Sequence, residues 1–180
     1  MYRFAILALA LVMMSCGGDS KKKEEKKEQP MSIGTSTQQT EKVEKAQKGV
    51  TVSEDGKSVT IDIEGDDAMK FNLKELKVKE GQKITLNLHH VGKMSVQVMG
   101  HNWVLLKPGV DMMKFGADAA AAEANDYIPE GSTDFIVHTD MIGGGEKTSI
   151  TFDAPAKGTY DFICSFPGHV ALMKGKFIVE

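Results

Sequence analysis

The sequence has only two cysteines, one arginine and no surplus of basic residues, and each shortage narrows what the protein can be. Cys16 and Cys164 are too few for a disulfide framework, and their different surroundings argue against a bridge between them. The 22 lysine and arginine residues against 25 aspartate and glutamate residues give a net charge of −3, with the two signs well mixed. Because a nucleic-acid-binding surface needs a clustered basic excess, we expect no nucleic-acid partner.

The main apolar run stands at the N-terminus and is too short to cross a bilayer as a stable helix. It covers residues 4–14, follows Arg3 and is closed by Ser15 and Cys16. This pattern resembles a bacterial lipoprotein signal, in which Cys16 becomes the lipidated first residue of the mature chain. We therefore predict a signal peptide over residues 1–15 and a protein anchored by lipid to the periplasmic face of a bacterial membrane. The alternative is simple cleavage, which gives a soluble periplasmic protein.

The segment after Cys16 has almost no large apolar side chains from Ser20 to Gly49. Lysine and glutamate alternate in blocks before giving way to serine, threonine and glutamine. Such a segment cannot bury enough apolar surface to offset the entropy that is lost on ordering. We predict that residues 16–49 form a disordered tether to a folded domain of residues 50–180.

From Val50 to the C-terminus, short runs of β-branched residues alternate with turn residues, which is typical of β-strands. The expected strands or strand pairs cover residues 58–65, 71–92, 96–106, 133–139, 147–169 and 172–180. Their length and spacing favour an all-β sandwich or barrel. The alanine-rich stretch from Pro108 to Gly131 differs, and it predicts a short helix within a long crossover connection.

Three residues with metal-binding side chains occur close together in the stretch "CSFPGHVALM". These are Cys164, His169 and Met173, and the proline and glycine between the first two predict a turn between strands. A thiolate, an imidazole and a thioether favour copper as the metal. A trigonal site of two histidines and one cysteine with a weak axial methionine is typical of blue copper proteins.

Such a site needs a second histidine, and the stretch "MGHNW" contains His101 at an expected strand boundary. The preceding Gly100 has no Cβ atom, so its carbonyl oxygen can approach a metal closely and act as a weak ligand opposite Met173. His90 and His138 lie at a strand end and within a strand, and we interpret both as packing or surface residues.

Four stretches resemble the azurins, which are bacterial blue copper proteins of the cupredoxin family: "IDIEGDDAMKFN", "VMGHNWVL", "HTDMIGGGEKTSITF" and "YDFICSFPGHVALMKGKF". The resemblance runs from about Val59 to the C-terminus. It implies a Greek-key β-barrel in which Pro108–Gly131 is a helical flap. It also implies one copper per chain with His101, Cys164 and His169 as equatorial ligands and with Met173 and the Gly100 carbonyl as axial ones. Asn102 would connect the two ligand loops by hydrogen bonds, and Phe166 would shape the surroundings of the metal.

The resemblance further implies a monomeric carrier of single electrons rather than an enzyme. Its redox partners would be proteins such as a c-type cytochrome, a nitrite reductase or a peroxidase. The electron would leave through His169, and the apolar docking patch around it would comprise Met69, Met94, Met99, Pro167, Ala171 and Leu172. Two other functions remain open on the residues alone, which are copper sequestration or delivery and an enzyme with Cys164 as its nucleophile. A structural zinc site is a weaker alternative, because zinc usually completes its tetrahedron with harder or stronger donors than a thioether.

One feature departs from the azurin pattern. Azurins have a disulfide between the first strand and a later turn, and the matching positions here are about Val59 and Gly81, neither of which is cysteine. Because a disulfide typically contributes about 2–4 kcal/mol, we expect a less stable domain or a compensating interaction.

Overall fold

The computed structural model describes residues 47–180, and the predicted signal peptide and all but the last residues of the predicted tether lie outside this range. The strands are β1 (Val50–Val52), β2 (Ser58–Asp66), β3 (Lys70–Phe71), β4 (Glu75–Val78), β5 (Lys83–His90), β6 (Val104–Leu106), β7 (Phe135–His138), β8 (Lys147–Asp153), β9 (Gly158–Ile163) and β10 (Lys174–Val179). The helices are α1 (Val96–Met99), α2 (Met112–Ala119) and two short 3-10 turns, η1 (Glu123–Asn125) and η2 (His169–Ala171). No helix in the described range is long and apolar enough to cross a membrane.

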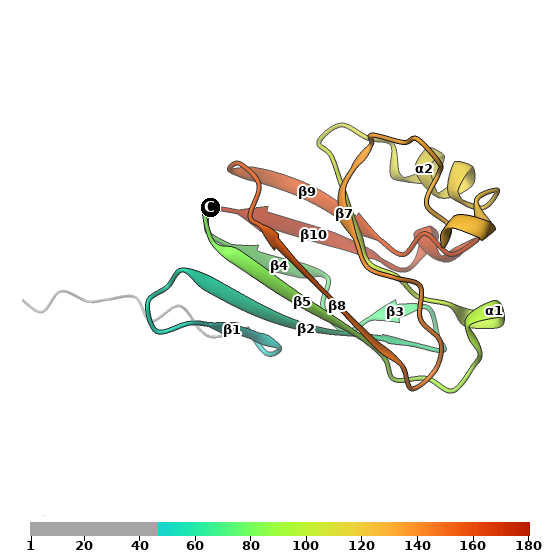
Figure 1. The fold of residues 1–180 in the computed structure, drawn as a ribbon, viewed down its shortest axis with the longest axis horizontal. Helices are drawn as coiled ribbons and strands as arrows, with labels where there is room; N and C mark the ends of the chain where they lie inside the picture. Colours follow the sequence, from blue (N-terminus) through green and yellow to red (C-terminus); the bar gives the residue numbers. More distant parts are fainter. Residues whose placement is uncertain (1–46) are drawn as a thin grey trace, which may run out of the picture. The chain divides into compact units, whose positions relative to one another are not determined.

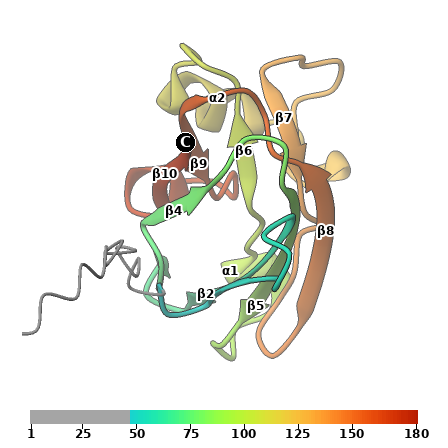
Figure 2. The same ribbon diagram turned by 90° about the vertical axis from the view of Figure 1, so that its left-hand side faces the viewer.

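The strands form two sheets that enclose a common core (Figures 1 and 2). The first sheet has the order β1-β2-β5-β8, with β3 paired to β2, and the second has the order β4-β10-β9-β6-β7. Most neighbours are antiparallel, but β2 with β5 and β4 with β10 are parallel, so the chain crosses repeatedly between the sheets. The predicted all-β sandwich with Greek-key connections is confirmed.

Side chains alternate between buried and more exposed positions along the strands, and this alternation forms the core between the sheets. In β2 every second side chain from Val59 is buried, and β5 has the same pattern from Ile84. A period of two places these residues on one face of a strand, so both strands turn an apolar face inward. Trp103 is fully buried in this core, and its ring centroid lies 5.6 Å from that of Phe162.

The flap that the sequence predicted between Pro108 and Gly131 is confirmed, and it contains α2 and η1. Asp111 caps α2, because its carboxylate accepts hydrogen bonds from the backbone amides of Met113 and Lys114 at 2.9 and 3.1 Å. The flap forms a second apolar cluster against β6 and β9. This explains why all three residues of β6 are buried although one sheet face alone would bury only alternate positions.

One predicted strand is wrong in part. Residues 96–99 lie in the one-turn helix α1 rather than in a strand, and the strand that follows, β6, begins only at Val104. The amides of Val98 and Met99 donate to the Ser95 carbonyl, and Val96 packs so closely on Gly143 that a Cβ there would lie 2.7 Å from the Val96 nitrogen. This tertiary contact favours a tight turn, which brings Gly100 and His101 to one end of the sandwich.

A buried glutamine lies next to the position where the azurin disulfide is missing. Gln82 is 5% exposed, and its side chain accepts from the Lys79 amide at 2.7 Å and donates to the Gly56 carbonyl at 2.8 Å. These two bonds join the turn before β5 to the turn between β1 and β2. Gln82 therefore connects by hydrogen bonds the region near Val59 and Gly81, the two positions at which the resemblance had implied a disulfide.

We expect Gln82→Ala to lower the free energy of unfolding by about 1–3 kcal/mol, because it removes two hydrogen bonds that each contribute about 0.5–1.5 kcal/mol. Urea denaturation of the metal-free domain measures this difference. Gln97→Ala is the matched control, since Gln97 is exposed in α1, and it should change stability by less than about 0.5 kcal/mol. Equal stabilities of the two variants would show that Gln82 does not compensate for the missing disulfide.

Candidate metal centre

A short loop between β9 and β10 carries three of the predicted copper ligands. We call Cys164–Met173 the ligand loop. Its two ends are joined by a hydrogen bond from the Cys164 amide to the Met173 carbonyl at 2.9 Å. Within it, the His169 amide donates to the Phe166 carbonyl at 3.0 Å, and the Met173 amide donates to the His169 carbonyl at 2.7 Å. The loop is thus closed on itself by its own backbone, and β9 and β10 determine its position.

His101 reaches the same place from a distant part of the chain. Its backbone pairs with Ile142 through two hydrogen bonds of 2.9 Å. Its ring Nε2 lies 3.0 Å from the Asp66 carbonyl oxygen at the end of β2. Because a carbonyl only accepts, Nε2 carries the proton, and Nδ1 retains a free lone pair for a metal.

The three strongest predicted donors converge at one end of the sandwich, where α1, α2 and the ligand loop lie together, away from the C-terminus (Figure 1). The Cys164 Sγ atom is 3.5 Å from His169 Nδ1 and 4.0 Å from His101 Nδ1, and the donor atoms all lie within 4.8 Å of one another. All three residues are buried.

This donor set fits a trigonal metal ion. Three atoms at metal distances of about 2.0–2.3 Å in one plane lie roughly 3.5–3.7 Å from one another, close to the sulfur–nitrogen distances found here. One thiol and two imidazoles are also the soft and intermediate donors that copper prefers.

One of the two predicted axial donors, the Gly100 carbonyl, lies beside this trio. Cys164 Sγ is 3.8 Å from the Gly100 carbonyl oxygen, and Met173 is fully buried. A Cβ on Gly100 would lie 2.6 Å from the Val96 oxygen and 2.9 Å from a Phe166 ring carbon, so no larger residue fits there.

Gly65 is a residue of the site that the sequence reasoning missed. A Cβ at this position would lie 2.7 Å from the His101 ring and 2.8 Å from the Met173 methyl group. Both side chains therefore press against the backbone of β2. A glycine inside an otherwise alternating strand is the signal that indicates such a close approach.

Asn102 and Phe166, which the resemblance had singled out, both lie close to the donor residues. The Asn102 side chain accepts from the Ser165 amide at 2.9 Å and donates to the Ser165 hydroxyl at 2.8 Å, so it joins the segment around His101 to the ligand loop. The Phe166 ring lies 4.6 Å from the His169 ring. Ser165 was not singled out from the sequence, because a serine in a loop has no distinguishing pattern.

Burial shifts the protonation of all three donors in the metal-free protein. It raises the pKa of the Cys164 thiol to about 12, although backbone hydrogen bonds from Asn102 and Phe166 oppose the shift. Burial lowers the pKa of His169 to about 4, with a further contribution from His101, and it also lowers the pKa of His101. At neutral pH the site therefore consists of a protonated thiol and two neutral imidazoles.

We expect metal binding at pH 7 to release one proton per ion, because Cys164 must become a thiolate while the imidazoles are already neutral. For the same reason, affinity should rise about tenfold per pH unit between pH 7 and 9, below the thiol pKa of about 12. Calorimetric titration without oxygen, in two buffers of different ionisation enthalpy, counts the protons. Cys164→Ser should release none, whereas a value near zero for the unaltered protein would contradict a protonated thiol.

The predicted docking patch is exposed only in part. Pro167, Ala171, Leu172 and Met94 are exposed, whereas Met69 and Met99 are half-buried. His169 itself is only 3% exposed, so its neighbours form most of the surface above it. Two exposed apolar residues on the helices at this end were not predicted, Val98 in α1 and Met113 in α2.

His90 lies behind His101 and outside the donor trio. The two rings stack with centroids 4.1 Å apart. The Gly92 amide donates to His90 Nδ1 at 3.0 Å, and Nε2 lies 2.8 Å from the Met99 carbonyl oxygen. Both ring nitrogens therefore have protein partners, in agreement with its interpretation as a packing residue.

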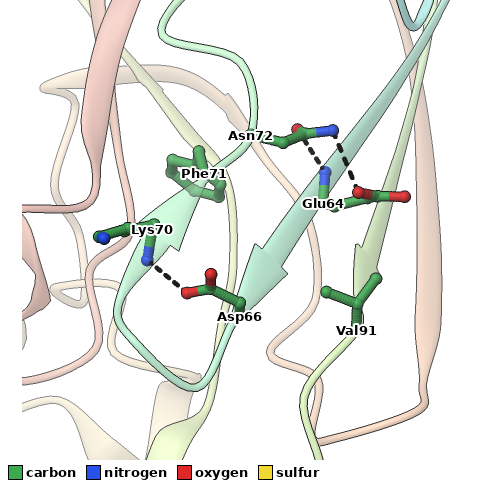
Figure 3. Close-up of a pocket in the computed structure, with 6 residues that line it drawn as sticks. All are labelled: Glu64, Asp66, Lys70, Phe71, Asn72 and Val91. Atoms are coloured by element: carbon green, nitrogen blue, oxygen red, sulfur yellow. Dashed lines mark hydrogen bonds between the residues drawn. The ribbon is translucent and has the colours of Figure 1, made fainter. Parts of the chain in front are cut away.

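A small pocket lies beside β2 and β3, and hydrogen bonds among its lining residues hold the end of β2 (Figure 3). It is lined by Glu64, Asp66, Lys70, Phe71, Asn72 and Val91. Its volume of about 190 Å³ is below the roughly 300 Å³ from which small-molecule sites usually start. The Asp66 carboxylate accepts from the Lys70 amide at 3.1 Å, and Asn72 bonds to both the amide and the carboxylate of Glu64. These bonds fix the end of β2 whose carbonyl orients His101.

The known proteins that this chain resembles are copper-binding proteins. Residues 57–180 match the family described as copper binding proteins, plastocyanin/azurin family. The azurin of Bordetella pertussis is 47% identical over 121 residues, which cover 64% of this chain and 80% of that protein. The azurin of Pseudomonas chlororaphis is 43% identical over 125 residues, which cover 67% and 97%.

A solved structure shows the same likeness. The dithionite-reduced auracyanin of Roseiflexus castenholzii superposes with a TM-score of 0.61 at 36% identity, over 67% of this chain and 96% of that one. The family match and the buried His-Cys-His donors together confirm copper as the cofactor. The chain belongs to the plastocyanin/azurin family of copper-binding proteins.

Proposed function

We propose that this protein is a periplasmic electron carrier of the blue copper type, in which His101, Cys164 and His169 would hold copper, with Met173 and the Gly100 carbonyl as weaker additional donors. The observation that carries the proposal is the buried convergence of one thiol and two imidazole nitrogens within 4.8 Å. Copper bound there supplies a centre that gains and loses one electron. The relatives named azurin and auracyanin support the same function.

The protein's own contribution is to keep the donors in place in both oxidation states. The Asp66 carbonyl fixes the tautomer and orientation of His101, and the paired bonds of Asn102 and Ser165 fix the two segments relative to each other. Hydrogen-bonded supporting residues of this kind limit the movement of ligands. Little rearrangement is therefore needed when an electron arrives or leaves.

Electron exchange would take place at the His169 end. The exposed residues Pro167, Ala171 and Leu172 surround this nearly covered ring and offer a small apolar surface. Brief redox encounters use small interfaces, so this surface suits a partner such as a c-type cytochrome, a nitrite reductase or a peroxidase.

Two other functions fit the site less well. A nucleophilic enzyme needs an accessible thiolate, whereas Cys164 is fully buried and burial raises its pKa to about 12. A copper-delivery protein needs an exchangeable site, whereas these donors are covered. Slow copper loss to a strong chelator would support the carrier, and rapid loss would favour delivery.

The test of the proposed function is reconstitution of residues 47–180 with Cu(II). We expect an intense visible absorption band and an EPR spectrum with narrow hyperfine splitting, followed by reversible one-electron reduction. A colourless protein with wide hyperfine splitting would overturn the proposal.

The location of the carrier depends on Cys16 as a lipid anchor. In a Gram-negative host that expresses the full chain, we expect the protein in the membrane fraction with incorporated labelled fatty acid. Cys16→Ser should lack the label and leave the membrane fraction, while its copper spectrum stays unchanged. A soluble, unlabelled wild-type protein would instead support cleavage without lipidation.

A further inference from the structure

A turn at the end of the flap has an unusual backbone. Asp126 and Tyr127 are consecutive and have φ angles of 49° and 57°, in the left-handed region that non-glycine residues rarely adopt. Backbone hydrogen bonds fix this conformation, because the Tyr127 amide donates to the Ala122 carbonyl at 3.0 Å and the Ile128 amide to the Asn125 carbonyl at 2.9 Å. Strained residues of this kind often have a functional reason, and we call this pair the flap turn.

Tyr127 connects the flap turn to the surroundings of His169. Its ring meets the ring of Phe166 edge to face, with centroids 5.1 Å apart and an interplanar angle of 63°. The Phe166 ring in turn lies 4.6 Å from the His169 ring. A tyrosine from the flap therefore limits the space in which the aromatic neighbour of a metal ligand can move.

Asp126 connects the same turn to Ser165, the residue after Cys164, through Asn102. Its backbone carbonyl accepts a hydrogen bond from Asn102 Nδ2 at 3.3 Å, and the same amide nitrogen donates to the Ser165 hydroxyl. Asn102 is fully buried, so its orientation depends on these few partners. The flap turn is thus linked to Ser165 through Asn102 and contacts Phe166 directly, so it reaches two consecutive residues of the ligand loop.

We propose that the flap turn is a positioning element for the ligand loop, with Tyr127 acting through Phe166 and the Asp126 carbonyl acting through Asn102. The flap is then part of the copper site rather than only a cover for the second sheet. The inference rests on the proposed function as far as copper is concerned, but its effect on the loop exists without metal.

The experiment compares three variants of the domain. Tyr127→Ala removes the ring, and we expect about tenfold weaker copper affinity together with a changed visible and EPR spectrum. Tyr127→Phe keeps the ring and should restore wild-type values. Phe135→Leu is the matched control, because Phe135 is also an aromatic residue that packs in the flap cluster, but its ring contacts Phe115 and His138 rather than Phe166. This control should leave affinity and spectrum unchanged.

Hydrogen exchange of the metal-free protein separates this inference from the proposed function. In Tyr127→Ala, the amides of His169 and Met173 should exchange at least severalfold faster, whereas the amides of β5 at the far sheet should not change. Unchanged loop exchange in Tyr127→Ala, or equal effects of Tyr127→Ala and Phe135→Leu, would overturn the inference. If the wild-type protein lacked the blue band, the proposed function would fail, and the exchange rates would still decide the role of the flap turn.

Discussion

Cys164→Ser abolishes the intense visible band of the copper-loaded protein, because that band requires charge transfer from a thiolate to the metal. A serine hydroxyl is a harder donor and stays protonated at neutral pH. We expect copper affinity to fall by more than the roughly 10–100-fold that the loss of a supporting side chain causes. Absorption spectroscopy and competition with a chelator measure the two effects.

The comparison requires that the variant folds. Cys164 is buried within the main core, and serine is close to it in size, so circular dichroism and thermal unfolding of the metal-free protein should resemble those of the wild type. A variant that folds and still shows the band would remove Cys164 from the site. This result would also invalidate the predicted release of a proton from its thiol.

Met173→Leu keeps copper and colour but raises the reduction potential, because a weak donor to Cu(II) is lost. A rise of about 60 mV or more corresponds to a tenfold change in the relative stability of the two oxidation states. Leucine conserves the volume of this fully buried side chain, so the core should tolerate it. Protein-film voltammetry measures the shift.

Met113→Leu is the control for this exchange, since Met113 is exposed on α2 and belongs to neither the donor set nor its supports. Its potential should equal that of the wild type. If both variants had the wild-type potential, Met173 would not act as an axial ligand.

The periodicity of apolar residues in the sequence was sufficient to predict most of the fold. The alternation in β2 and β5 predicted strands with one buried face, and the composition of 108–131 predicted the helical flap. The error at residues 96–99 has a physical cause. The β-branched Val96 and Val98 favour a strand locally, but the close contact of Val96 with Gly143, which is distant in sequence, favours a helical turn.

The residues of the candidate site could likewise be predicted only in part. Side-chain chemistry predicted His101, Cys164 and His169, because few other combinations of residues favour copper. Asn102 was implied as a support by the resemblance, but the supports that act through backbone carbonyls could not be predicted. Every residue type has a backbone carbonyl, so nothing in the sequence singles out those of Asp66 and Asp126. Only the folded chain shows which carbonyl faces His101 or Asn102.

The closeness of Cys164, His169 and Met173 in the chain has a consequence for how copper stabilises the protein. An unfolded chain still has these three side chains within one short segment, so it retains some affinity for the ion, whereas His101 joins them only after the sandwich has formed. A ligand stabilises a fold only by the difference between its affinities for the folded and unfolded chains. Copper should therefore raise the melting temperature less than its affinity for the native protein alone would suggest, and a newly made chain can bind the ion before folding is complete.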